Sequence, residues 1–99
     1  MDREWLEPWE KISDDQAMFF KGQLVKEITS THPLFGLQLM PIGRSEANDD
    51  ILVSLSTGKL AVVHLTWGNS GDHLWPSTEL YDSWEEFVDK KMLEDNFGY

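Results

Sequence analysis

The chain has 99 residues, no cysteine, and 18 acidic against 8 basic residues, which gives a formal net charge of −10. This length fits a single domain over residues 1–99, and the lack of cysteine excludes disulfides, thiolate catalysis and zinc sites built on cysteine. Binding to nucleic acid or to anionic membranes is disfavoured, because both require a basic surface. The first residues lack the features of a signal peptide and no apolar run could span a bilayer, so a cytoplasmic location is expected.

The N-terminal part of the sequence predicts an irregular segment followed by a helix. Residues 1–12 are expected to form a short irregular segment whose aromatic rings dock on the core. The helix is predicted to begin at Ser13, which forms a capping-box pattern with Gln16. It is predicted to stop at His32, because the residue before a proline avoids helical backbone angles. Its apolar face consists of positions three or four residues apart, namely Ala17, Phe20, Leu24 and Ile28.

Three strands are predicted in the middle of the chain, over residues 35–43, 51–56 and 60–67. Side chains alternate along the first two as they do in strands, and the third is largely apolar on both faces, which is typical of a central strand. The short turn at residues 57–59 predicts that the second and third strands form a hairpin. Residues 77–81 are a candidate fourth strand at the edge of the sheet.

A second helix is predicted to begin at Ser83, which forms another capping-box pattern with Glu86. Its apolar face consists of Trp84, Phe87, Val88 and Met92. Together these elements predict an α+β fold in the order α-β-β-β-α, with both helices packed on one face of an antiparallel sheet. The sheet is expected to have three strands, or four if residues 77–81 join it. Three of the five tryptophans lie in segments that the pattern does not place: Trp5, Trp9 and Trp75.

The predicted strands carry a distinctive run of residues. It comprises Asp-Asp-Ile-Leu at residues 49–52 and Ala-Val-Val-His-Leu-Thr-Trp at 61–67, and it continues in Trp-Pro at 75–76 and Tyr-Asp-Ser-Trp-Glu-Glu-Phe at 81–87. This run resembles the core of a small bacterial family of uncharacterised proteins. The resemblance implies a bacterial, cytoplasmic α+β domain. It draws attention to His64, Thr66 and Trp67 without assigning them a role, because the family has no established function.

The best candidate for a chemical site lies at the end of the third predicted strand, since no nucleotide-binding, serine-hydrolase or zinc-peptidase motif is present. Strand alternation places His64 and Thr66 on one face and Trp67, at the end of the same predicted strand, on the other. A loop folding back over the sheet would add His73. A histidine there can act as a general base or anchor a ligand, or it can be a structural histidine bonded to a carbonyl or carboxylate. His64, His73 and Asp72 could ligate a metal, but their spacing matches no template, so no cofactor is predicted.

The charge, the small size and the lack of a catalytic motif favour a non-enzymatic protein-interaction module. Such a module would bind a basic protein, as small acidic inhibitors and immunity proteins do. The candidate partner face on the C-terminal helix is Glu85, Glu86 and Asp89. Two alternatives stay open. One is a homodimer that pairs strand edges, and the other is a small-ligand binder or hydrolase with a pocket around His64, Thr66, Trp67 and His73.

Overall fold

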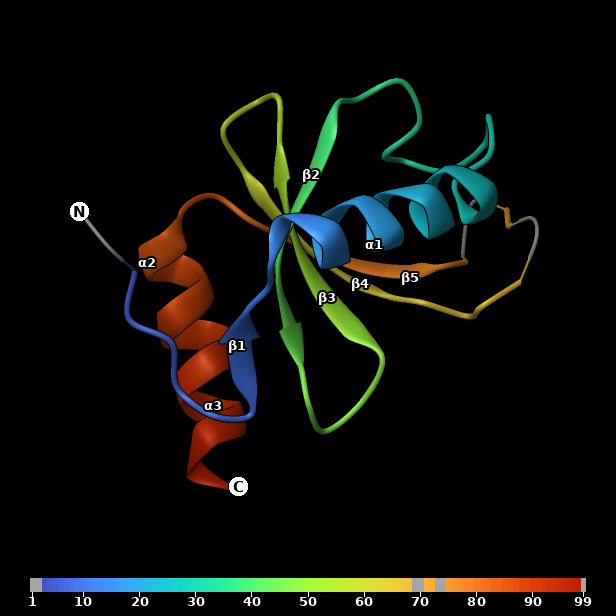
Figure 1. Ribbon diagram of the computed structural model, residues 1–99. Coiled ribbons are helices and arrows are strands. Elements are labelled where there is room, and N and C mark those ends of the chain that lie inside the picture. The colour runs from blue at the N-terminus through green and yellow to red at the C-terminus, as the bar shows by residue number, and fades with distance from the viewer. Residues whose placement is uncertain (1–2, 69–70, 73–74, 99) are drawn as a thin grey trace.

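The computed structural model describes residues 3–68, 71–72 and 75–98. Its centre is a five-stranded antiparallel sheet, whose strands lie side by side in the order β1-β2-β3-β4-β5 (Figure 1). The strands are β1 (Trp9–Lys11), β2 (Leu39–Ser45), β3 (Asp50–Leu55), β4 (Leu60–His64) and β5 (Ser77–Tyr81). The predicted hairpin is confirmed, because β3 and β4 pair antiparallel across a short turn.

The helices are α1 (Asp14–Glu27) and a C-terminal helical run made of α2 (Trp84–Phe87), the π-helical turn η1 (Val88–Met92) and α3 (Leu93–Phe97). Both predicted helix starts are confirmed. At α1 the Ser13 hydroxyl accepts a hydrogen bond from the Gln16 backbone N–H, and the Gln16 side chain accepts one from the Ser13 N–H. At α2 the Ser83 hydroxyl accepts a hydrogen bond from the Glu86 N–H. These bonds satisfy N–H groups that the first helical turn leaves without partners.

The α+β class and the antiparallel sheet are confirmed, but the predicted number and order of elements are wrong. The sheet has five strands, and the chain order is β-α-β-β-β-β followed by the C-terminal helical run. The unpredicted strand, β1, has only three residues, too few to show alternation, and it forms by pairing with residues 43–45 of β2. The candidate edge strand at residues 77–81 does form, as β5. The first predicted strand begins at Leu39, because backbone turns hold residues 35–37.

The two helical parts pack on opposite faces of the sheet, which corrects the prediction that both share one face (Figure 1). Successive side chains of a strand point to alternate faces. On one face Ile51 and Val53 pack in a core with Leu24 of α1. On the other face Leu52 packs in a second core with Phe87 of α2. The central strands are apolar on both sides, so a layer of helices on one face alone would leave apolar surface in water.

The tryptophans that the sequence left unplaced have different surroundings. Trp9 is buried on β1 against Phe87, with ring centroids 5.1 Å apart, and its indole N–H donates a hydrogen bond to a carboxylate on α3 at 2.7 Å. Trp5 is partly buried and lies over Gly43, where the Cβ of any other residue would collide with the indole. Trp75 is exposed. The expected docking of N-terminal aromatic rings on the core is therefore confirmed for Trp9 and Trp5.

Tyr81 borders the core beneath the C-terminal helical run. Its side chain is buried, and its hydroxyl donates a hydrogen bond to the Glu79 carboxylate at 2.9 Å. Burial raises the pKa of Tyr81 well above its ordinary value, and the hydrogen bond and the charge of Glu79 add to this effect. The hydroxyl therefore stays protonated and remains a donor to Glu79 at pH values where an exposed tyrosine would ionise.

Candidate functional site

His64 and Asp50 form a hydrogen-bonded pair at one end of the sheet. They lie opposite each other on β4 and β3, in a register that puts both side chains on the same face. The distance from His64 Nδ1 to Asp50 Oδ1 is 2.7 Å. The Asp50 side chain is 11% exposed, whereas the His64 side chain is 47% exposed. The pair thus presents an imidazole to solvent while its carboxylate is shielded.

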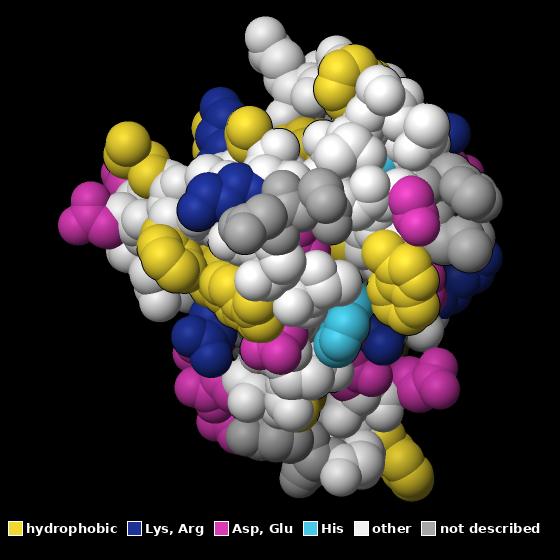
Figure 2. Space-filling model, turned by 90° about the vertical axis from the view of Figure 1, so that its right-hand side faces the viewer, with side chains coloured by type: hydrophobic (Ala, Val, Ile, Leu, Met, Phe, Trp, Pro, Cys, Tyr) yellow, Lys and Arg dark blue, Asp and Glu magenta, His cyan; other side chains and the backbone are white. Residues whose placement is uncertain are grey.

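The carboxylate fixes the orientation of the imidazole. Because a carboxylate accepts hydrogen bonds, it selects the form of His64 that carries a proton on Nδ1 and leaves Nε2 as an acceptor. A histidine oriented in this way can serve as a general base or bind a polar ligand. Ser77 lies opposite His64 on β5, on the side away from Asp50. No hydrogen bond joins Ser77 to His64 in the part of the chain that the structure describes. Figure 2 shows an exposed histidine beside acidic and hydrophobic side chains on one face of the molecule.

Thr66 and Trp67, which the sequence grouped with His64, are held toward α1 instead. Strand β4 ends at His64, and Trp67 has a φ of 63°, so strand alternation does not extend to these residues. The buried Glu27 carboxylate accepts hydrogen bonds from the Thr66 N–H at 2.8 Å, the Thr66 hydroxyl at 2.7 Å and the Trp67 N–H at 3.1 Å. The hydroxyl of Thr66 is therefore used to anchor the loop after β4.

Trp67 nevertheless comes close to the histidine pair from another direction. Its indole packs against Phe19 and Phe20 of α1, with centroid distances of 6.0 and 6.4 Å. These rings border a hollow of about 210 Å³ that Asp50 also lines. The structure therefore brings His64 and Trp67 to the surroundings of the same carboxylate. The fourth predicted pocket residue, His73, lies outside the described residues.

Two buried side chains, Glu27 and His32, anchor the loops beside this site through contacts that the sequence patterns did not predict. Glu27 accepts a further hydrogen bond from the Gln23 side chain at 2.7 Å. His32 accepts one at Nδ1 from the Leu34 N–H at 3.1 Å, and its Nε2 lies 2.9 Å from the Pro76 carbonyl oxygen. The signal for Glu27 was its position within the apolar face of the predicted helix. Nothing local indicates the partner of His32, which lies 44 residues away along the chain.

The predicted partner face lies along the C-terminal helical run. Glu85 and Asp89 are exposed, and neither forms an ion pair with any residue that the structure describes. Glu86 is only partly exposed and pairs with Lys90, with 3.5 Å between the ammonium nitrogen and a carboxylate oxygen. Of the three predicted carboxylates, Glu85 and Asp89 are therefore the ones available to a partner.

Two large apolar side chains extend this face along α3. Leu93 is 46% exposed and Phe97 is 95% exposed. An α-helix has 3.6 residues per turn, so residues four apart lie at slightly different angles around the helix axis. The π-helical turn η1 has more residues per turn and rotates the residues that follow it partly back. Residues four apart therefore stay on one side of the run, opposite the buried Phe87. We call the resulting surface the acidic stripe, and it consists of Glu85, Asp89, Leu93 and Phe97.

Residues 3–68, 71–72 and 75–98 contain neither a metal-binding cluster nor a helix that could span a membrane. No group of three or more histidine and carboxylate side chains is placed there to hold a metal ion. No helix in these ranges has the length and apolar character that crossing a bilayer requires. Comparison with protein-family models, with curated proteins and with solved structures gives no match. The family resemblance carried by residues 49–52, 61–67, 75–76 and 81–87 therefore stays a prediction.

Proposed function

We propose that this chain is a non-enzymatic protein-interaction module that binds a basic partner through the acidic stripe. The observation that carries the proposal is that Leu93 and Phe97 are exposed beside Glu85 and Asp89, two carboxylates that form no ion pair with any described residue. Exposed aromatic side chains supply much of the binding energy of protein interfaces. Carboxylates around them steer and select a basic partner, and the net charge of −10 acts in the same direction.

An inhibitor-like or immunity-like role fits this arrangement. The helical run is tied to the sheet by Phe87 and Met92, which are 0% and 1% exposed. The stripe is therefore held in place before a partner arrives, which reduces the entropy that binding must overcome. A preformed acidic surface of this kind suits the covering of a basic active site or a basic binding site on another protein.

Charge reversal on the stripe should weaken partner binding. We expect the double variant Glu85→Lys, Asp89→Lys to lose about tenfold or more in affinity, and the remaining binding to depend less on salt. The partner is first identified by retention on the immobilised full chain from lysate of the source organism, with washes at low and high salt and mass spectrometry. The affinity of the purified partner is then measured by calorimetry.

The matched control is Glu46→Lys, Asp49→Lys, which makes the same change in net charge on the exposed connection between β2 and β3. A basic protein that is held by the wild type and by this control, but lost by the stripe variant, supports the proposal. Equal losses in both variants would show that net charge alone acts. Retention by all three proteins would contradict the assigned face.

The Asp50–His64 pair favours a second candidate function, a small-ligand binder or hydrolase. The free Nε2 of His64 could accept a proton from a bound water or from the Ser77 hydroxyl, while Asp50 holds the ring. Trp67 and the hollow beside Asp50 would contribute an apolar wall. In this alternative, Thr66 positions the loop and takes no part in the chemistry.

Hydrolysis of p-nitrophenyl acetate tests this alternative. His64→Gln is expected to lower the rate by about tenfold or more, since it removes the base. Asp50→Asn is also expected to lower the rate, because the ring loses the acceptor that selects its protonated nitrogen. Lys59→Gln, in the turn at the end of the β3–β4 hairpin away from His64, is the control and should leave the rate unchanged. A wild-type rate equal to that of His64→Gln would exclude this function for the test ester.

A further inference from the structure

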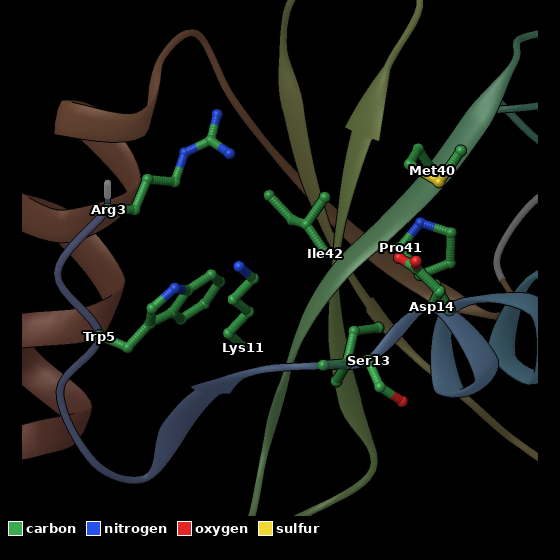
Figure 3. A pocket seen from close by; sticks show the side chains of 10 residues that line it. Arg3, Trp5, Lys11, Ser13, Asp14, Met40, Pro41 and Ile42 are labelled. Carbon is green, nitrogen blue, oxygen red and sulfur yellow. The ribbon is translucent and has the colours of Figure 1, made fainter. Parts of the chain in front are cut away.

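A groove runs along α1 beside β2. It consists of two adjoining hollows of about 530 and 470 Å³, which share Met40 and residues near the start of α1. The first hollow lies between the N-terminal segment, with Arg3 and Trp5, and β2, with Met40 and Ile42 (Figure 3). The second hollow continues along α1 as far as Val25. We call the two together the α1–β2 groove.

The groove exists because β1 is short. β1 pairs with residues 43–45 of β2, so residues 39–41 have no strand beside them on that side among the described residues. Pro41 has no N–H to offer a new strand, and proline is typical of edges that do not add strands. Recognition in the groove must therefore come mainly from side chains.

The charge of the groove is opposite to that of the whole chain. Four of the 8 basic residues form ion pairs with carboxylates within the described ranges, namely Arg44, Lys59, Lys90 and Lys91. Three of the other four line the groove, namely Arg3, Lys11 and Lys21. The Lys11 ammonium points into the space between Trp5 and Ile42 (Figure 3). Asp14 is the one carboxylate among the described lining residues.

Apolar side chains line the groove between these cations. Met18, Val25 and Met40 are 74%, 70% and 53% exposed. Adjoining exposed apolar side chains of this size mark interaction surfaces, and covering them gains about 25 cal/mol per Å² of apolar area buried. A complementary ligand must therefore offer apolar groups together with negative charge.

We infer that the α1–β2 groove binds an acidic, amphipathic segment of a partner protein. Its carboxylates lie against Lys11 and Lys21, and its apolar side chains cover Met18 and Met40. Residues 14 to 25 of α1 extend over about 16 Å at 1.5 Å per residue, a distance that about five extended residues span. The groove and the acidic stripe have no residue in common and are complementary to ligands of opposite charge, so this inference does not depend on the proposed function.

Selection of peptides on the immobilised full chain tests the inference. The probe is a phage-displayed library of random peptides of roughly ten residues, long enough to cover the groove. The expected peptides combine aspartate or glutamate with leucine, isoleucine or phenylalanine. A synthetic peptide of the selected sequence should bind the double variant Lys11→Glu, Lys21→Glu about tenfold or more weakly than the wild type.

The matched control is Lys26→Glu, Lys59→Glu, which makes the same change in net charge at exposed positions outside the groove. Its affinity for the peptide should stay within about twofold of the wild type, because distant surface charges are screened by salt. Circular dichroism checks the folding of each variant. If charge reversal unfolds the chain, Lys11→Gln with Lys21→Gln replaces it, with a smaller loss of affinity expected.

Four results would overturn the inference. They are enrichment of basic peptides, enrichment of no peptide, equal binding of an acidic peptide to wild type and groove variant, and a dimer in sedimentation that the groove variant dissociates. The last would show that a second copy fills the groove. None of these results bears on the acidic stripe, whose own variant is Glu85→Lys, Asp89→Lys.

Discussion

Replacing Phe87 with alanine is expected to lower the free energy of unfolding by about 3–5 kcal/mol, because it removes a large side chain from a packed core. Phe87 is 0% exposed. Its ring contacts Trp9, Tyr81 and Trp84, with centroid distances of 5.1, 5.8 and 5.5 Å. The variant loses the transfer free energy of the ring and leaves a cavity that these large neighbours can fill only in part.

Urea denaturation followed by tryptophan fluorescence measures this change. Phe97→Ala is the matched control, because the same side chain is 95% exposed on the same helical run, and its effect should stay within about 0.5 kcal/mol. Equal denaturation midpoints for the two variants would contradict the claim that Phe87 packs in the second core. The slope of the transition should be similar in all three proteins if only the folded-state packing changes.

Replacing Glu27 with glutamine is expected to lower the free energy of unfolding by about 2–3 kcal/mol, although the two side chains have nearly the same shape. Each carboxylate oxygen of Glu27 accepts two hydrogen bonds. One oxygen receives the N–H and the hydroxyl of Thr66, and the other receives the Trp67 N–H and the Gln23 amide. In glutamine one oxygen becomes an NH₂ group, which faces two donors and can accept from neither.

Denaturation in urea measures the loss, and Glu46→Gln is the control, since Glu46 is exposed. Hydrogen exchange provides a local measurement. The amide protons of Thr66 and Trp67 should exchange faster in Glu27→Gln. The exchange rates of amides in the middle of β3 should change only as much as the free energy of global unfolding changes. An unchanged midpoint together with unchanged exchange at Thr66 would contradict the anchoring role of Glu27.

The helix starts and the central hairpin could be predicted because their signals are local. A hydroxyl at Ser13 reaches only the next turn of its own helix, and the turn between β3 and β4 joins strands that follow each other directly. The strand β1 could not be predicted in this way. Its three residues are stabilised by pairing with β2, more than 30 positions away in the sequence, so no local pattern marks them.

The candidate site likewise combines residues that local patterns predicted with contacts that only the tertiary structure creates. His64 could be selected from its position on a predicted strand, but its partner Asp50 follows only from the register of β3 against β4. Thr66 and Trp67 were assigned by extending strand alternation past the point where β4 ends. The strand ends there because the buried Glu27 carboxylate on α1 accepts hydrogen bonds from the backbone N–H groups of Thr66 and Trp67.

By itself the sequence determined the α+β class, the starts of both helices and the acidic character of the C-terminal run, since each depends on composition or on neighbours within one helical turn or hairpin. The tertiary structure alone decided that the helices cover opposite faces, that Asp50 orients His64, and that three cations gather along the α1–β2 groove. These features join residues far apart in the chain, and their contacts arise only when the apolar side chains on both faces of the central strands are buried at once.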